Sequence, residues 1–125
     1  MSSNQEKFAK MIRVFGISNC DKCREAKKWL EQQEIDFEFI DFRKQPLATA
    51  DIQRWIESIG QDALLNRRGA TWRALPDEVK ENFEKSDVVN IILEKPTLIK
   101  RPVFETREGL LLGFSSGVIE ELLSL

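Results

Sequence analysis

The sequence predicts an α/β domain in which a helical insertion separates two parts of a mixed four-stranded sheet. Segments rich in β-branched and aromatic residues lie near both ends of the chain, and apolar residues between them recur at helical spacing. The 125 residues are enough for one domain with its own core. We therefore expect the order βαβ, helical insertion, ββα in a single domain over residues 12–125, preceded by a polar N-terminal extension over residues 1–11.

The first part is expected to be a βαβ unit. Residues 12–17 and 37–42 have strand composition, and the nearly continuous apolar character of the second strand predicts burial on both faces. Residues 21–34 between them predict a helix, preceded by Ser18 and Asn19, which are residue types that cap helices. The apolar stripe of this helix consists of Cys23, Ala26 and Leu30.

The middle of the chain is expected to be helical. A helix begins near Thr49 and ends at Gly60, residues 62–75 are polar and basic, and another helical segment begins at Pro76. Residues 87–95 have strand propensity, but their setting before a proline favours a helix.

The last third returns to strands. Residues 103–106 and 110–114 predict a hairpin with its turn at residues 108–109. Ser115 or Ser116 then caps a final helix. The core face of that helix is expected to contain Val118, Ile119, Leu122 and Leu123.

Composition excludes several classes of function. The chain has two cysteines and no histidine, so neither a Ser-His-Asp nor a Cys-His mechanism can operate within it, and a four-ligand zinc site is disfavoured. The net charge of -2 offers no general attraction to nucleic acid or to an acidic membrane surface. The first eleven residues lack an apolar run and no segment is long enough to span a bilayer, so a cytoplasmic location without membrane contact is expected.

The Cys20-x-x-Cys23 pair lies between a predicted strand and a predicted helix, which is typical of a thioredoxin-like redox motif. A helix N-terminus stabilises a thiolate, and Lys22 and Arg24 add positive charge that Asp21 opposes, so we expect a lowered pKa for Cys20. The spacing lets the two thiols form a disulfide. Alternatively, both are small buried apolar residues, and the position of Cys23 on the apolar stripe is compatible with an unreactive thiol.

Two groups of basic residues are further candidates. In thioredoxin-like folds the residue before a strand-initiating proline often faces the active cysteine, and Arg101 before Pro102 offers a forked donor for an oxyanion or a carboxylate. The other group, Arg67, Arg68 and Arg73, suits an anionic thiol such as glutathione. Both groups are equally compatible with solvated surface charge.

Four separated segments resemble the arsenate reductase (ArsC)/Spx family: residues 15–23, 64–73, 96–103 and 112–115. The resemblance extends from about Ile12 to the C-terminus. It implies a thioredoxin-like fold with a helical insertion and a cis peptide bond before Pro102. The pattern Asn-x-Arg-Gly-x-Thr-Trp-Arg is most similar to the YffB-like branch.

YffB-like proteins are regarded as glutathione-dependent thiol reductases. The resemblance thus implies that Cys20 is the nucleophile, with Cys23 as a possible resolving thiol. It implies glutathione or glutaredoxin as the co-substrate, a small oxyanion or thiol as the substrate, and no bound cofactor. The substrate-binding residues that we expect are Asn19, Arg68, Arg101 and Pro102.

The same resemblance implies two alternatives. Glutaredoxin-linked arsenate reductases use one cysteine, which matches Cys20, and three arginines, of which only Arg101 is present here. Asp62 and Gly113 stand at the other two positions. Spx proteins instead use a C-x-x-C pair as a redox switch and bind the RNA polymerase α subunit.

Overall fold

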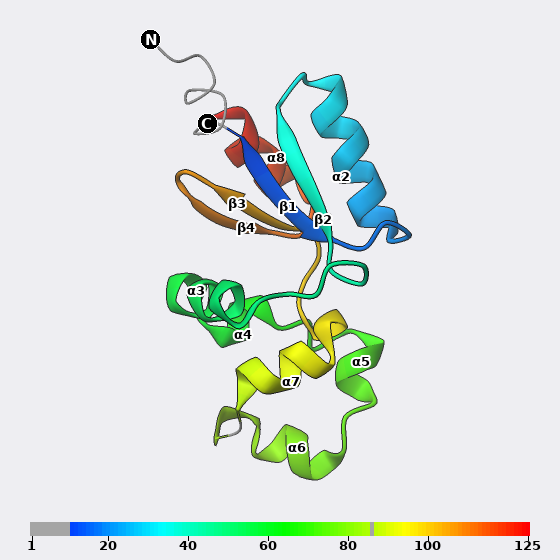
Figure 1. Ribbon diagram of the computed structural model, residues 1–125, viewed down its shortest axis with the longest axis vertical. Helices are drawn as coiled ribbons and strands as arrows, with labels where there is room; N and C mark the ends of the chain where they lie inside the picture. Colours follow the sequence, from blue (N-terminus) through cyan, green and yellow to red (C-terminus); the bar gives the residue numbers. More distant parts are fainter. Residues whose placement is uncertain (1–10, 86) are drawn as a thin grey trace. The chain divides into compact units, whose positions relative to one another are not determined.

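The computed structural model describes residues 11–85 and 87–125 (Figure 1). They form two compact units. The first combines the described residues up to Gln45 with Arg101–Leu125, and the second is Pro46–Lys100. Apart from Met11, the predicted polar extension lies outside the described residues.

A four-stranded mixed sheet forms the centre of the first unit, in the order β2-β1-β3-β4. β1 pairs in parallel with β2 and antiparallel with β3, and β3 and β4 form an antiparallel hairpin. The predicted α/β class, the mixed sheet and the hairpin are therefore confirmed. The strands are β1 Ile12–Gly16, β2 Phe37–Asp41, β3 Val103–Thr106 and β4 Gly109–Leu112.

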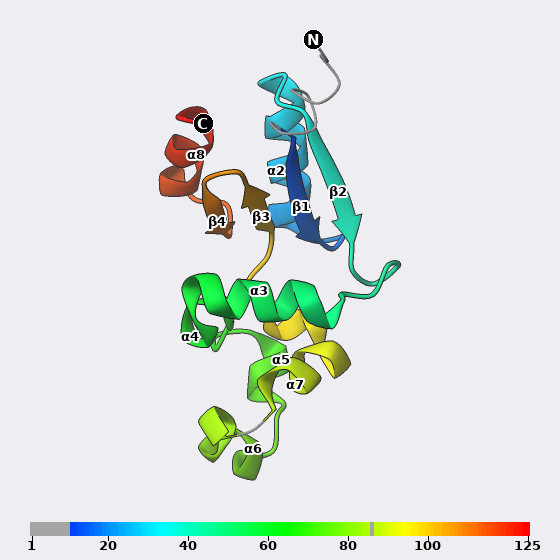
Figure 2. The ribbon, with the colours of Figure 1, turned by 60° about the vertical axis from the view of Figure 1, so that its left-hand side comes forward.

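Two helices, α2 (Asp21–Gln32) and α8 (Ser116–Leu123), pack against the sheet of this unit (Figure 2). Both helices contribute side chains to one apolar cluster. Burial of these side chains away from water stabilises the unit. Trp29 and Phe114 meet edge to face across it, with ring centroids 5.9 Å apart. The buried members of the cluster are Ile12, Val14, Ala26, Leu30, Phe104, Val118 and Leu122.

The prediction that the second strand is buried on both faces is wrong. β2 is an edge strand, so it has a neighbour on one side only. Ile40 is buried, but Glu38 is exposed and Phe37 and Phe39 are half-buried. The Lys27 ammonium lies 4.4 Å from the centre of the Phe39 ring and covers part of its outer side.

The prediction for the last helix is correct in its cap and partly wrong in its core face. The Ser115 hydroxyl accepts a hydrogen bond from the Val118 N–H at 3.3 Å. Val118 and Leu122, four residues apart, are buried and Ile119 is half-buried, but Leu123 is 58% exposed. One helical step of about 100° turns Leu123 away from the side that packs on the sheet.

The second unit is helical, as predicted, but it contains more short helices than the sequence pattern indicates. Gly60 ends α3 with a φ of 82°, and residues 62–75 include short helices instead of only a basic loop. The segment over residues 87–95 is helical, and Trp55 is completely buried in this unit. The helices are α3 Thr49–Ile59, α4 Gln61–Leu64, α5 Ala70–Arg73, α6 Asp77–Glu81 and α7 Val88–Glu94, with 3₁₀ turns η1 Phe83–Lys85 and η2 Pro96–Leu98.

No helix within the described part of the chain is both long enough and apolar enough to cross a membrane.

Candidate functional site

Cys20 stands at the junction between β1 and α2. Its N–H donates to the carbonyl of Ile17 at 3.1 Å, which closes the turn after β1. Its carbonyl accepts the Arg24 N–H at 2.9 Å, the first hydrogen bond of the helix. Cys20 is therefore itself the N-cap residue, and neither Ser18 nor Asn19 caps α2. Its thiol is half-buried.

The surroundings of Cys20 lower the pKa of its thiol from the ordinary value of 9.0. Burial acts in the opposite direction, but hydrogen bonds to sulfur outweigh it. The donors are the backbone N–H groups of Cys23 and Lys22, the side chain of Arg101 and the thiol of Cys23. The first turn of α2 thus stabilises a thiolate with its own amide groups, as predicted.

Cys23 has the opposite character. Its side chain is completely buried, and burial together with the charge of the neighbouring Cys20 raises its pKa to about 11. A backbone hydrogen bond from Ile17 and the charge of Arg101 only partly compensate. At neutral pH, Cys23 is therefore a protonated thiol that donates to Cys20.

Gly16, at the end of β1, provides the room for Cys23. A Cβ atom at this position would lie 2.5 Å from the Cys23 Sγ and 3.4 Å from the Phe39 ring. Only glycine allows the buried thiol to pack against the strand.

Arg101 and Pro102 lie opposite the cysteine pair in the same unit. The Arg101–Pro102 peptide bond is cis, as the resemblance implies. The Arg101 side chain hydrogen-bonds to Cys20. Pro102 is buried, and its carbonyl accepts the N–H of Gly113 at 2.9 Å, which ties the start of β3 to the end of β4.

The two cations predicted to act on Cys20 are engaged on the surface of α2. Arg24 pairs with Asp21, and Lys22 lies 3.6 Å from Glu25. The side-chain cation that contacts Cys20 is instead Arg101, which comes from a distant part of the chain.

Asp41, a residue that sequence reasoning missed, holds the turn before Cys20. One carboxylate oxygen accepts the Ser18 N–H at 3.0 Å and the Ser18 hydroxyl at 2.6 Å, and the other accepts the Arg43 N–H at 2.9 Å. Although burial opposes ionisation, these hydrogen bonds lower the pKa of Asp41. The signal in the sequence that could have pointed to Asp41 is its position as the last residue of β2, the strand that pairs with β1.

The remaining predicted residues are Asn19 and Arg68. Asn19 is exposed in the turn between β1 and α2, next to Cys20. Arg68 belongs to the second unit, where it lines a pocket of about 380 Å³. The structure thus brings Asn19, Cys20, Cys23, Arg101 and Pro102 together within the first unit.

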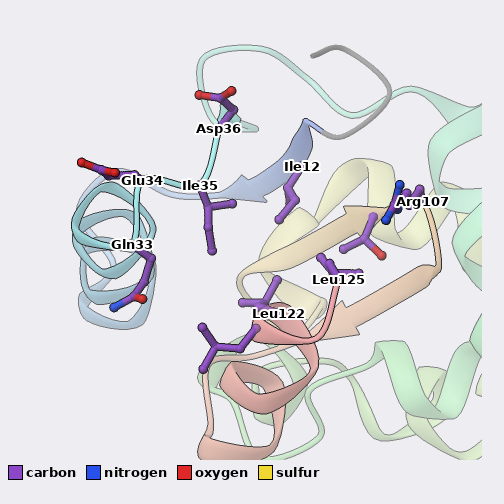
Figure 3. Close-up of a pocket in the computed structure, with 10 residues that line it drawn as sticks. Ile12, Gln33, Glu34, Ile35, Asp36, Arg107, Leu122 and Leu125 are labelled. Carbon is purple, nitrogen blue, oxygen red and sulfur yellow. The ribbon is translucent and has the colours of Figure 1, made fainter. Parts of the chain in front are cut away.

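A cavity of about 430 Å³ in the first unit lies at the other end of the sheet (Figure 3). Ile12, the first residue of β1, lines it together with Ile35, Leu122 and Arg107, whereas Cys20 follows the last residue of β1. This cavity is therefore separate from the thiol site. Among the described residues, no three His, Cys, Asp or Glu side chains are grouped so that they could hold a metal ion.

Two curated relatives match most of this chain. An uncharacterized protein from Haemophilus influenzae is 37% identical over 84% of this chain and 92% of its own length. The global transcriptional regulator Spx from Streptococcus pyogenes serotype M3 is 26% identical over 91% of this chain and 86% of its own length.

Two solved structures share the fold. The YFFB protein superposes with a TM-score of 0.82 and 28% identity, covering 90% of this chain and 98% of its own. An arsenate reductase (ArsC) related protein from Brucella melitensis gives a TM-score of 0.73 and 34% identity, covering 92% of this chain and 96% of its own. The fold is accordingly thioredoxin-like with a helical insertion. Residues 15–122 match the ArsC family, so the chain belongs to that family.

Proposed function

We propose that this protein is a thiol-dependent reductase in which Cys20 is the nucleophile and glutathione or a glutaredoxin supplies the electrons. The observation that carries this proposal is the environment of Cys20. Helix amides and the Arg101 side chain lower its pKa although burial opposes them. A thiolate at neutral pH is the reactive form for disulfide exchange.

In the first step, the Cys20 thiolate attacks one sulfur of a disulfide substrate. A bond forms between the Cys20 Sγ and that sulfur, and the other sulfur leaves as a thiolate that takes a proton from water. In this proposal Arg101, whose side chain hydrogen-bonds to Cys20, binds negative charge next to the attacking sulfur. We assign Asn19, the residue before Cys20, and Pro102, the residue after Arg101, to substrate contact.

In the second step, a thiolate of glutathione attacks the mixed disulfide and restores Cys20. This attack on the substrate sulfur leaves a disulfide between glutathione and that half of the substrate. A second glutathione thiolate attacks the glutathione sulfur of this disulfide, which forms glutathione disulfide and releases the second substrate thiolate, so two glutathione thiols are oxidised for each disulfide reduced. We favour this route over resolution by Cys23 because burial keeps the pKa of Cys23 at about 11. A protonated thiol is a slow nucleophile.

The test is turnover of 2-hydroxyethyl disulfide with glutathione, coupled to glutathione reductase and NADPH. Cys20→Ser is expected to abolish NADPH consumption, whereas Cys23→Ala, which fits the buried site without a new polar group, keeps a rate of the same order. Wild-type turnover in Cys20→Ser contradicts the proposal. Loss of turnover in a folded Cys23→Ala variant would show that Cys23, rather than glutathione, resolves the mixed disulfide.

A second candidate is a redox-switched regulator like Spx, which the relative named as a global transcriptional regulator supports. It requires a reversible Cys20–Cys23 disulfide that changes the affinity for the RNA polymerase α subunit. Binding of the purified α subunit to the oxidised and reduced protein separates the two candidates. If the oxidised and reduced forms bind the α subunit equally, or if neither form binds it, the regulator is rejected and the reductase is retained.

A further inference from the structure

The buried thiol of Cys23 has the aromatic ring of Phe39 as a neighbour. The position that a Cβ atom would take at Gly16 lies 2.5 Å from the Cys23 Sγ and 3.4 Å from the Phe39 Cε1, so the ring edge lies next to the sulfur. Phe39 pairs with Val14 across the parallel strands, and both side chains point to the face of the sheet that α2 covers. A sulfur at the edge of an aromatic ring makes a favourable contact.

Lys27 covers the same ring from the helix. It follows Cys23 by four residues, so the two side chains lie on one side of α2. The Lys27 ammonium is 4.4 Å from the centre of the Phe39 ring, and both of these side chains are half-buried. Because β2 is the edge strand and Cys23 is completely buried, Phe39 and Lys27 separate the thiol from solvent at this edge of the sheet. These two side chains form the Phe39–Lys27 cover.

On its other sides, Cys23 faces the groups of the thiol site. The charge of Cys20 opposes a second negative charge on Cys23, whereas the Arg101 guanidinium and a backbone hydrogen bond from Ile17 favour it. Burial is the strongest of these influences, and it raises the pKa of the Cys23 thiol to about 11. Side chains that keep water away from Cys23 therefore control the strongest influence on its ionisation.

We propose that the Phe39–Lys27 cover determines which thiol completes the reaction, because it keeps Cys23 out of disulfide exchange and leaves the mixed disulfide on Cys20 to glutathione. This inference rests on the proposed function. Without the cover, Cys23 loses its proton to water, and its thiolate attacks the Cys20 Sγ of the mixed disulfide. A bond forms between the two Sγ atoms, the bond from Cys20 to the substrate sulfur breaks, and the substrate half leaves as a thiolate that takes a proton from water.

The first experiment measures alkylation of Cys23 alone. Cys20→Ser leaves Cys23 as the only thiol of the chain, and labelling with iodoacetamide at pH 8 is followed by intact mass. Phe39→Ala in this background is expected to raise the labelling rate at least about tenfold, because a pKa that is lower by one gives about ten times more thiolate. Lys27→Ala is expected to raise it about two- to fivefold, because loss of the cation–π contact lets the ring open more often.

Phe37→Ala is the matched control for Phe39→Ala. Phe37 is half-buried on the same face of β2, but it pairs with Ile12, at the end of β1 that is distant from the thiol. Lys28→Ala, at the next and exposed position of α2, is the control for Lys27→Ala. Both controls are expected to leave the labelling rate unchanged. Equal acceleration in the controls, or an unchanged rate in Phe39→Ala, overturns the proposal, and if Phe39→Ala does not fold, Lys27→Ala alone decides.

Urea separates loss of the cover from unfolding of the protein. Labelling through a local opening changes little at low urea concentration, whereas labelling through global unfolding rises steeply with urea. We expect the rate in Phe39→Ala to be nearly independent of urea below the unfolding transition. A steep rise would assign the acceleration to unfolding and overturn the proposal.

The second experiment follows the reaction in the protein with both thiols, mixed with 2-hydroxyethyl disulfide in the absence of glutathione and quenched with acid. By intact mass, wild type is expected to carry the mixed disulfide on Cys20, and Phe39→Ala is expected to convert it to the Cys20–Cys23 disulfide. Conversion in wild type overturns the proposal. The absence of any adduct in wild type rejects the reductase itself, whereas normal turnover with unchanged labelling of Cys23 in the variants rejects the cover and keeps the reductase.

Discussion

Cys20 and Cys23 are three residues apart, but their thiol groups have very different surroundings. The Cys20 sulfur receives hydrogen bonds from two backbone amides, the Cys23 thiol and the Arg101 side chain. The Cys23 side chain is instead completely buried in the core, out of contact with water. The pKa of Cys20 is lowered, and that of Cys23 is raised to about 11. One helical turn therefore separates a thiolate from a thiol that supports it by hydrogen bonding.

The pH dependence of Cys20 alkylation tests the role of Arg101. In wild type, the rate is expected to reach half its maximum at a pH below 9.0, because the folded protein stabilises the thiolate. Arg101→Ala removes one donor and the midpoint moves to higher pH, while Arg101→Lys restores part of the shift. The measurement is iodoacetamide labelling followed by mass spectrometry.

Arg24→Ala is the control for this prediction, since Arg24 is exposed and already pairs with Asp21. An identical upward shift in both variants would show that general surface charge, rather than the Arg101 contact, sets the reactivity.

Asp41 is a positioning residue that acts on Cys20 through the turn at Ser18. Asp41→Asn replaces one carboxylate oxygen by a donor, so either Ser18 or Arg43 loses its acceptor. We expect a loss of about 1–3 kcal/mol in the free energy of unfolding and slower alkylation of Cys20. Urea denaturation and the alkylation pH profile measure the two effects.

The control for Asp41 is Asp36→Asn, the same substitution at an exposed position just before the other end of β2. Ser18→Ala removes only the 2.6 Å hydroxyl contact and is expected to have an intermediate effect. An unchanged pH profile in a destabilised Asp41→Asn protein would reduce Asp41 to a purely structural residue.

At the scale of elements, the close approach of α2 to β1 depends on Gly16. Gly16→Ala would place a methyl group 2.5 Å from the Cys23 Sγ, so the helix or the thiol must move. We expect destabilisation by about 1–3 kcal/mol, as for other overpacked sites. Gly117→Ala in α8 meets only the Ser115 Oγ at 3.8 Å and is expected to stabilise the protein by about 0.5–1 kcal/mol. Thermal denaturation of both variants checks the opposite signs, and equal shifts would contradict the contact.

The sequence predicted those elements whose pattern is local and periodic. Ala26 and Leu30 follow the 3.6-residue repeat of α2, and both are buried as expected. Helices of four residues, such as α4 and α5, contain only one turn, so the 3.6-residue pattern does not repeat within them and cannot predict them. The edge position of β2 follows from the strand order, which the composition of a single strand does not contain.

For the candidate site, too, the sequence predicted the features that have a local pattern and missed those that depend on contacts between distant residues. Cys20, Cys23 and the residue before the cis proline carry local signals, and the structure places them together. The contact between Ser18 and Asp41 joins residues 23 positions apart, so it needs the register of β1 and β2. The pairing of Arg67 with Asp62 also depends on the fold of the turn rather than on its composition.

At the scale of the whole molecule, membership of the ArsC family does not by itself assign arsenate as the substrate. Reduction of an arsenate dianion needs several positive groups of the protein, fixed in place, to stabilise the negative charge of the transition state. The resemblance to arsenate reductases implies three arginines around the oxyanion, and among the three matching positions of this chain only position 101 is an arginine. Asp62 stands at one of the other positions and is occupied by Arg67 at 2.8 Å, and Gly113 stands at the last with a φ of 75°.

We therefore expect no arsenate-dependent consumption of NADPH in an assay with glutathione, glutaredoxin and glutathione reductase, even at millimolar arsenate. The same preparation should reduce 2-hydroxyethyl disulfide, which shows that its Cys20 is active. Asp62→Arg restores one positive group but also releases Arg67, and Gly113→Arg forces a side chain into a left-handed backbone conformation, so neither alone is expected to create the activity. Arsenate-dependent turnover that Cys20→Ser abolishes would show that Arg101 and the helix amides suffice, and it would make arsenate the substrate.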